Sequence, residues 1–220
     1  MKTVVAIHTA ISMVEPTKQL FAEHLPGHRL INIVDDSLIQ DVIQANAVTP
    51  AVRKRLMNYY QSAVDAGADV IFNTCSSIGD VAITARDFVN IPLVKIDDAM
   101  ALNAVENYSK IGVLATLPTT LDPTARLIEQ FANKHKKAID IKKGLAEGAF
   151  HSLMSGDVQT HDHLIMETSK KLANKVDVFV LAQGSMAKMQ GNITKETGKP
   201  VLSSPLLGIL NVKSVIENLK

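Results

Sequence analysis

The 220-residue sequence contains a single cysteine and no tryptophan, and aromatic residues make up only 4% of it. One cysteine cannot form an intrachain disulfide bond, which favours a reducing, cytoplasmic location. The net charge is +1, so there is no basic surplus for nucleic acid, and few aromatic rings are present to stack on bases. Apolar runs are no longer than a strand, so we predict no membrane-spanning helix. The composition is typical of a soluble globular protein.

Several chemical motifs are missing as well. The dinucleotide motif GxGxxG, the phosphate-binding motif GxxxxGK[ST] and the nucleophile elbow GxSxG do not occur. His161 and His163 are two residues apart and would not share a helix face, and no third partner is evident, so we predict no metal site. The two Asp-Asp pairs at 35–36 and 97–98 each follow a predicted strand and are interpreted as helix caps.

The sequence does contain an internal repeat. The segment ADVIFNTCSS, which holds Cys75, is matched by VDVFVLAQGS, in which Gln183 takes the place of the cysteine. Asp69 and Asp177 precede the apolar parts of these segments and are 108 positions apart (177 − 69). Matches that keep one order and one spacing favour two copies of one α/β unit. The further matches at this offset are Pro92 with Pro200, Lys2 with Lys110, and Leu30–Ile33 with Ala138–Ile141.

Strand-length apolar segments alternate with helical patterns along the chain, which is typical of parallel strands covered on both faces. Thr49-Pro50 is a strong helix start, and Gly67 follows the helical pattern as its stop. We therefore predict an α/β fold of two pseudo-symmetric, doubly wound units with parallel four-stranded sheets. The predicted halves are residues 1–108 and 109–220, and the last helix could pack back on the first half.

Ligands of open α/β sheets bind beyond the carboxyl ends of the strands, so we expect the active site in the cleft between the halves. Equivalent strand ends would face each other there, His8 with Thr116 and Cys75 with Gln183. Cys75 precedes a predicted helix start, whose free backbone amides favour a thiolate. Iodoacetamide should then label it well below about pH 8.5, the ordinary thiol pKa. A buried core thiol is the alternative.

Neutral hydrogen-bond donors are abundant near these positions. Hydroxyls and backbone amides at strand-to-helix turns suit a small carboxylate whose charge grows towards an enediolate. Ordinary helix capping is the alternative for each serine and threonine, and His8 could be a site residue or an ordinary hydrogen-bonded histidine. The substrate-binding candidates are Asn73, Thr74, Ser76, Ser77, Thr116, Thr119, Thr120, Gly184 and Ser185.

The chain resembles the aspartate/glutamate/hydantoin racemase superfamily over nearly its whole length. The resemblance is carried by NTCSS at 73–77, GVLAT at 112–116, DVFVLAQGSM at 177–186 and PVLSSPLLG at 200–208. It implies two pseudo-symmetric halves with the site between them, no cofactor (pyridoxal phosphate included), and a homo-oligomer of two or more chains. Racemases of this family use two thiols on opposite faces of the α-carbon, one to remove the proton and one to return it.

Cys75 falls on the first family cysteine, but Gln183 falls on the second. A primary amide forms hydrogen bonds and does not usefully exchange a proton at neutral pH, so the two-thiol mechanism does not carry over. The family also includes maleate isomerases with two cysteines and an arylmalonate decarboxylase with one. In that decarboxylase the cysteine lies at the position of Gln183, and Ser76 and Ser77 fall on its carboxylate-binding hydroxyls.

Three functions remain open from the sequence. The first is a racemase or isomerase acting at the α-carbon of a small carboxylate, amino acid or hydantoin. In it, Cys75 is the thiolate base or nucleophile, and His8 or a bound water is the second acid beside Gln183. The second is a one-thiol decarboxylase or cis–trans isomerase of the same superfamily. The third is a non-enzymatic protein, either a binder of small molecules such as carboxylates or a thiol sensor, because a fold alone does not determine function.

Overall fold

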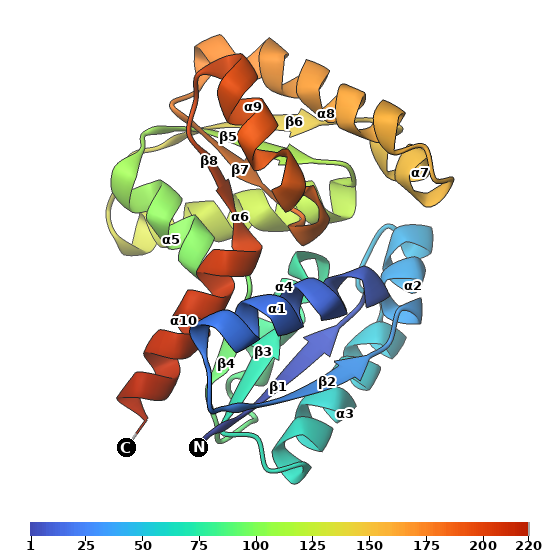
Figure 1. The fold of residues 1–220 in the computed structure, drawn as a ribbon, viewed down its shortest axis with the longest axis vertical. Coiled ribbons are helices and arrows are strands. Elements are labelled where there is room, and N and C mark those ends of the chain that lie inside the picture. The colour runs from blue at the N-terminus through green and yellow to red at the C-terminus, as the bar shows by residue number, and fades with distance from the viewer. Residues whose placement is uncertain (220) are drawn as a thin grey trace. The chain divides into compact units, whose positions relative to one another are not determined.

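The computed structural model describes residues 1–219, and these residues form two compact units (Figure 1). Unit 1 comprises Met1–Asp98 together with the segment that begins at Pro205, and unit 2 comprises Ala99–Ser204. The first unit boundary therefore follows residue 98, whereas we placed it after residue 108 from the sequence.

Unit 1 contains a sheet of four parallel strands. The strands are β1 (Thr3–His8), β2 (Arg29–Val34), β3 (Val70–Asn73) and β4 (Leu93–Lys95). Their order in the sheet is β2-β1-β3-β4. Val5 and Ile7 of β1 belong to one hydrophobic cluster and Val4 and Ala6 to another, and all four are buried. The sheet is thus covered on both faces, which explains why its central strand is apolar without alternation.

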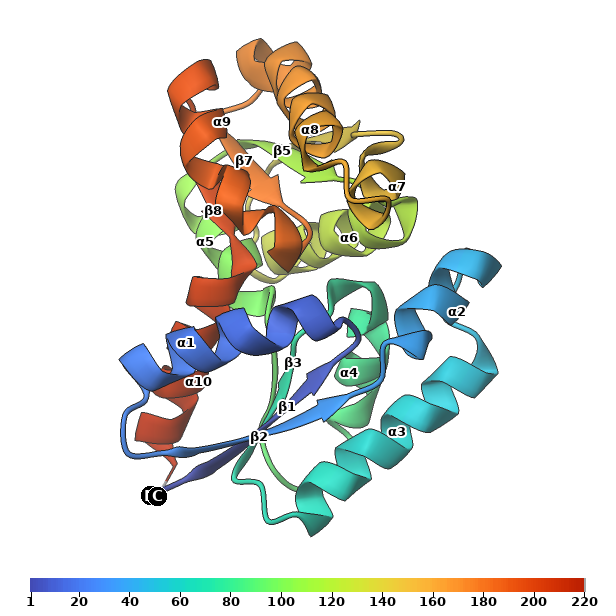
Figure 2. The same ribbon diagram turned by 45° about the vertical axis from the view of Figure 1, so that its right-hand side comes forward.

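Helices cover the two faces of this sheet. They are η1 (Ile11–Met13), α1 (Val14–His24), α2 (Ser37–Ala45), α3 (Pro50–Asp65), η2 (Ser76–Ile78), α4 (Gly79–Ala85) and α10 (Ser204–Asn218). Helices α2, α3 and α4 pack on the face of Val5 and Ile7, whereas α1 and α10 pack on the face of Val4 and Ala6. Figure 2 shows α1 and α3 on opposite sides of the strands.

Unit 2 repeats the topology of unit 1. Its strands are β5 (Lys110–Ala115), β6 (Asp140–Leu145), β7 (Val178–Leu181) and β8 (Val201–Ser203). All pairs are parallel and the order is β6-β5-β7-β8, which matches unit 1 strand for strand. The prediction of an α/β fold with two parallel four-stranded sheets is confirmed.

The helices of unit 2 also lie against its sheet. They are α5 (Asp98–Asn107), α6 (Pro118–Lys134), α7 (Ala149–Met154), α8 (Val158–Leu172), η3 (Ala173–Lys175), η4 (Gly184–Met189) and α9 (Gln190–Thr197). Ile165 of α8 and Ile193 of α9 pack with Leu114 and Phe179 of the sheet, and α6 lies along β5 and β6. Within residues 1–219, no helix is both long and apolar enough to cross a membrane.

An aspartate before the third strand holds the first strand in the same way in both units. The Oδ2 atom of Asp69 accepts a hydrogen bond from the N–H of Thr3 (2.7 Å), and that of Asp177 accepts one from the N–H of Lys110 (2.9 Å). The shared contact makes Thr3 equivalent to Lys110, an offset of 107 (110 − 3). The sequence match of Lys2 with Lys110 was therefore wrong by one residue.

The second strands need a larger correction. Thr3 pairs with Arg29 and Lys110 pairs with Asp140, so Arg29 corresponds to Asp140 at an offset of 111 (140 − 29). The predicted match of Leu30 with Ala138 was therefore three residues out. A one-residue shift along a strand moves every side chain to the other face, so these corrections change which residues occupy equivalent places.

The start and end of α3 follow the sequence prediction. The Oγ1 atom of Thr49 accepts a hydrogen bond from the N–H of Val52 (3.3 Å), and Pro50 is the first helical residue. Gly67 follows the end of the helix with φ of +77°, a conformation that side chains with a Cβ adopt at a cost.

Gly208 of α10 provides a test of the packing in unit 1. A Cβ atom added there would lie 2.8 Å from the backbone oxygen of Ile96. Gly208→Ala should therefore destabilise the protein by about 1–3 kcal/mol, although alanine favours helices. Gly191 of α9 has nothing within 4 Å of an added Cβ, so Gly191→Ala should cost nothing. Thermal unfolding followed by circular dichroism measures both variants, and equal effects would contradict the packing of α10.

Candidate active site

Cys75 lies two residues beyond the end of β3, at the carboxyl edge of the unit 1 sheet. Its backbone is extended (φ −126°, ψ 122°), and it directly precedes η2. The backbone N–H groups of Ser77 and Ile78 donate hydrogen bonds to its sulfur, and the residue is partly exposed. The sulfur therefore lies where ligands of parallel sheets bind.

The hydroxyl of Thr9, the residue that follows β1, donates a further hydrogen bond to the sulfur. Burial nevertheless raises the pKa of the Cys75 thiol above its ordinary value, and the three donors lower it only in part. The nearby Asp97 carboxylate also raises this pKa. Burial therefore opposes the effect of the helix-start amides, which we expected to make Cys75 a thiolate. The free-energy cost of burying the charged sulfur exceeds what the donors return.

Asn73 and Thr74 hold the turn that carries Cys75. The Nδ2 atom of Asn73 donates to the Cys75 carbonyl (2.9 Å), and its Oδ1 atom accepts from the Tyr60 hydroxyl (3.0 Å). Burial raises the pKa of Tyr60, so this phenol remains a donor. The Thr74 hydroxyl lies 3.0 Å from both the carbonyl oxygen of Ile7 and Nδ1 of His8, and it donates its one proton to either of them. Both residues are buried and engaged with protein groups, so they position the turn.

His8, the last residue of β1, is fully buried. Its Nε2 atom lies 2.9 Å from Oδ1 of Asn32, and its Nδ1 atom lies 3.0 Å from Oγ1 of Thr74. Burial lowers the pKa of the imidazole, which favours the neutral ring. With both nitrogens partnered, His8 has none left for a substrate. The structure therefore argues against His8 as the second acid.

Unit 2 holds the counterpart of the Thr9–Cys75 contact. Thr116 follows β5, and its N–H and hydroxyl both donate to Oε1 of Gln183, at 2.6 and 2.9 Å. The backbone of Gln183 (φ −123°, ψ 133°) matches that of Cys75, and Gln183 likewise precedes a 3-10 turn. The predicted pairing of His8 with Thr116 is therefore wrong, because Thr9 corresponds to Thr116 at the offset of 107 (116 − 9).

Sequence analysis missed Thr9 because the repeat was aligned at a single offset. A shift of the first strand by one residue would have placed IHT against LAT and revealed the shared threonine. The Thr9–Cys75 and Thr116–Gln183 contacts show that the two units keep the same architecture at this place. They differ in the group that the threonine holds, a thiol in unit 1 and an amide in unit 2.

A buried charge network was also missed. Lys95, the last residue of β4, is 3% exposed, and its Nζ atom lies 3.5 Å from Oδ1 of Asp97 and 3.6 Å from Oδ1 of Asp98. Arg86 forms an ion pair with the other oxygen of Asp98. Asp98 is the first residue of α5, which is consistent with the interpretation of the Asp-Asp pair as a helix cap. Asp97 is 1% exposed and belongs to the buried charge network.

This network reaches the turn that contains Cys75. A Cβ atom added to Gly79, the first residue of α4, would lie 2.7 Å from Cε of Lys95, so the lysine passes directly against the helix start. A lysine that ends an apolar strand and precedes two acids, as in PLVKIDD, is the sequence signal that could have revealed the network.

The hydroxyl candidates are not helix caps. Cys75, Ile78 and Leu117 occupy the N-cap positions of η2, α4 and α6, with no side-chain capping bond. The Oγ1 atom of Thr119 is buried and has no hydrogen-bond partner among residues 1–219. Of the remaining candidates, Ser76, Ser77 and Thr120 are buried, Gly184 is partly exposed and Ser185 is exposed.

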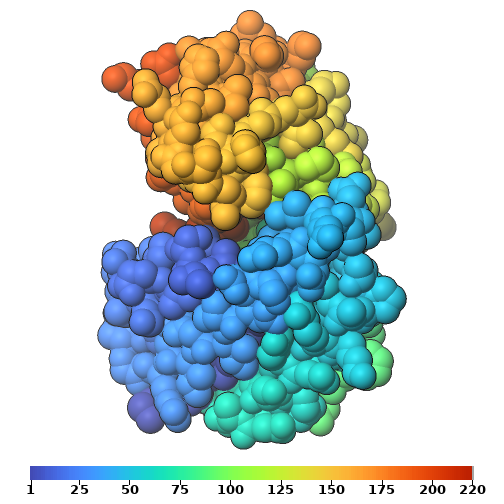
Figure 3. Space-filling view, turned by 90° about the vertical axis from the view of Figure 1, so that its right-hand side faces the viewer, coloured from blue at the N-terminus to red at the C-terminus, as the bar shows by residue number. Residues whose placement is uncertain are grey.

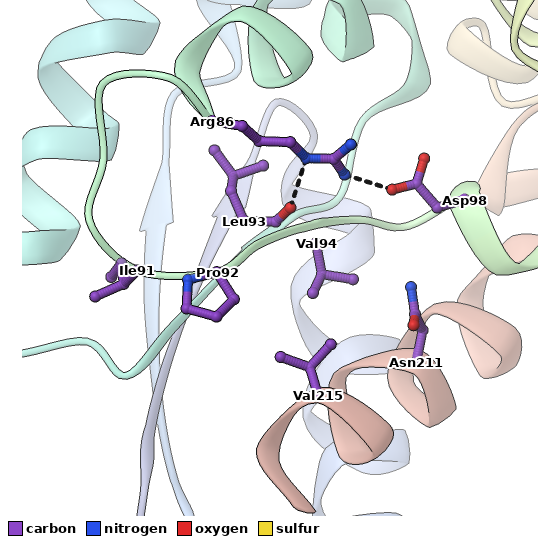
Figure 4. Close-up of a pocket in the computed structure, with 8 residues that line it drawn as sticks. All are labelled: Arg86, Ile91, Pro92, Leu93, Val94, Asp98, Asn211 and Val215. Carbon is purple, nitrogen blue, oxygen red and sulfur yellow. Dashed lines mark hydrogen bonds and ion pairs between the residues drawn. The ribbon is translucent and has the colours of Figure 1, made fainter. Parts of the chain in front are cut away.

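A cavity of about 330 Å³ in unit 1 lies apart from this set of residues. None of the predicted site residues lines it (Figure 4). Its walls are Arg86, Ile91, Pro92, Leu93, Val94, Asp98, Asn211 and Val215. Within the described residues, no group of three histidine, cysteine or acidic side chains could hold a metal ion.

Alkylation by iodoacetamide tests the environment of the thiol, because only the thiolate reacts. The midpoint pH for labelling Cys75 should lie above that of a free thiol such as glutathione, since the pKa of Cys75 is raised. Thr9→Val removes one donor at constant size and should raise the midpoint by a further ~0.5–1 pH unit. Thr116→Val is the matched control in unit 2 and should leave it unchanged. A midpoint below that of glutathione would refute this description.

Comparisons with known proteins identify the family and the fold. The family model for Asp/Glu/Hydantoin racemase matches residues 3–210. No curated protein sequence matches the chain. Glutamate racemase RacE1 from Bacillus anthracis is similar in structure, with a TM-score of 0.75, 12% identity, and coverage of 98% of this chain and 82% of that chain.

Two further solved structures show the same fold. Allantoin racemase from Klebsiella pneumoniae has a TM-score of 0.70 and 16% identity, and the match covers 99% of this chain and 88% of that chain. Unliganded arylmalonate decarboxylase has a TM-score of 0.59 and 16% identity, with 100% and 95% covered. The family model spans nearly all of the sequence, and the chain therefore belongs to the Asp/Glu/Hydantoin racemase family.

Proposed function

We propose that the protein is a racemase or isomerase that acts at the α-carbon of a small carboxylate, amino acid or hydantoin, with Cys75 as a proton-carrying group. Membership of the racemase family supports an enzyme of this class. The observation that carries the proposal is the Thr9–Cys75 contact: the sulfur of a partly exposed residue at a strand end is held by one hydroxyl and two backbone N–H groups.

The raised pKa of Cys75 sets the direction of its first step. The thiol keeps its proton at neutral pH, so Cys75 begins as an acid that protonates the α-carbon of an enediolate. The thiolate left behind is the base for the opposite enantiomer. Both directions are needed in a racemase, and a thiol serves in each.

The enediolate requires hydrogen-bond donors, because an α-proton is very weakly acidic. Ser76 and Ser77 follow Cys75 directly in the turn at the strand end. These neutral donors suit a carboxylate whose negative charge increases during the reaction. We assign these neutral donors to substrate binding. The proton transfers of the proposed reaction use only side chains of this protein.

A one-thiol decarboxylase is the second candidate, and the same raised pKa favours it. In such a reaction the bond between the α-carbon and one carboxylate breaks, carbon dioxide leaves, and the S–H proton forms the new C–H bond. A single acid is sufficient for this reaction.

Incubation in heavy water with aspartate, glutamate, allantoin, other hydantoins, arylmalonates and maleate tests both candidates. We expect loss of the α-proton NMR signal together with inversion for at least one compound. Cys75→Ala should reduce this rate by at least about 100-fold, because it removes the acid and base.

Each other outcome has a distinct meaning. Release of carbon dioxide without racemisation would replace the first candidate by the second. A Cys75→Ala variant that is as active as the wild type would refute the assignment of Cys75. A wild-type protein that changes none of the compounds would refute both candidates, and binding of the same compounds would then indicate a non-enzymatic protein.

A further inference from the structure

We infer that the cavity in unit 1 is a binding site for a small aliphatic α-amino acid, distinct from the site that contains Cys75. Its walls come from the end of α4, from β4 and the residues before it, from Asp98 and from α10, and all of them belong to unit 1. The volume of about 330 Å³ is at the small end of the range for ligand sites. A cavity of this size suits a compound no larger than an amino acid.

One end of the cavity carries a cation and an anion. Nη2 of Arg86 forms an ion pair with Oδ2 of Asp98, and Nε of Arg86 donates to the carbonyl oxygen of Leu93 (3.0 Å). A guanidinium has five N–H groups, so donors remain on Nη1 for a ligand carboxylate. The carboxylate of Asp98 likewise has lone pairs that can accept from a ligand ammonium group.

Buried charges hold the Asp98 side chain from the other side. Its Oδ1 atom lies 3.6 Å from Nζ of Lys95, and Asp97 lies 3.5 Å from the same ammonium group. The formal charges of these two acids, Lys95 and Arg86 sum to zero. A carboxylate that is already oriented costs less entropy when a ligand binds. A ligand with both charges therefore complements this end better than an ion of either sign.

Asn211 of α10 adds a neutral polar group to the same end. Figure 4 shows its amide pointing toward the side of the cavity where Asp98 lies. Within residues 1–219, this amide has no hydrogen-bond partner. Because a primary amide both donates and accepts, Asn211 can contact either the carboxylate or the ammonium group of a zwitterion.

The remaining wall of the cavity is aliphatic. Val94 of β4 and Val215 of α10 point toward each other in Figure 4, and Ile91, Pro92 and Leu93 complete this wall. Apolar surface of this kind gains free energy when a branched aliphatic group displaces water from it. Paired charges at one end and aliphatic surface at the other match an α-amino acid such as leucine.

Titration of the full-length protein by ligand-observed NMR tests this ligand class. We expect L-leucine to bind with a Kd of about 0.1–1 mM, which is reasonable for a ligand of its size. 4-Methylpentanoate lacks the ammonium group and 3-methylbutylamine lacks the carboxylate, so each should bind at least about tenfold more weakly. An analogue that binds as tightly as leucine would overturn the inference, because the paired charges would then have no role.

Two variants of α10 test the location. Val215→Phe fills the aliphatic part of the cavity and should weaken leucine binding at least about tenfold. Leu210→Phe is the matched control, because Leu210 is exposed on the same helix and does not line the cavity. It should bind as the wild type does. If Val215→Phe does not fold, Asn211→Leu replaces it, since it removes the amide at nearly constant size and should weaken binding about 3–10-fold.

A third variant separates this site from the proposed reaction. Cys75→Ala should bind leucine as the wild type does, because the thiol does not line the cavity. Leucine binding that is lost in Cys75→Ala but kept in Val215→Phe would place the ligand at Cys75 and overturn the inference. So would a wild type that binds no aliphatic amino acid at about 10 mM. Binding that depends on Val215 in a protein that converts none of the test compounds would support the inference and refute the proposed function alone.

Figure 3 shows unit 1 in blue and cyan from the side of α2 and α3. The cavity is lined instead by β4 and α10, at the other edge of the sheet from β2. A fluorescent or spin label on α3 should therefore leave leucine binding unchanged, and a loss of binding on labelling there would contradict the assigned location.

Discussion

The register of the two parallel sheets is the constraint on which the site depends. Asp69 and Asp177 each hold the first residue of the strand beside them, so neighbouring strands end at matching heights. This alignment brings Thr9 to Cys75 in one unit and Thr116 to Gln183 in the other. The central strands β1, β3, β5 and β7 are apolar and almost wholly buried, so their polar residues are concentrated at the carboxyl ends.

One architecture therefore supports two different groups. The threonine hydroxyl donates to a thiol in unit 1 and to an amide in unit 2, and only the thiol can exchange a proton. Burial and the Asp97 carboxylate keep that proton on Cys75 despite three donors. Family membership together with a protonated thiol is consistent with proton transfer to a carbon atom.

Sequence reasoning succeeded where the signal is local. The helix start at Thr49-Pro50, the apolar strands and the position of Cys75 after a strand all follow from residues adjacent in the chain. It failed where a residue's state depends on distant neighbours. His8 has Asn32 and Thr74 on its two nitrogens, contacts that no spacing along the chain reveals. The sequence shows the free amides at a helix start, which favour a thiolate, but it does not show the depth of burial that raises the pKa of Cys75.

The amino-acid sequence by itself determined the α/β class, the repeated topology and the location of a lone thiol at a strand end, because each arises from apolar patterns and turn residues within short segments. Only the tertiary structure decided that Thr9 is the partner of Cys75 and that burial raises the pKa of its thiol. These properties depend on which strands are neighbours and on how much protein surrounds each polar atom, and both are set by packing between segments far apart in the chain.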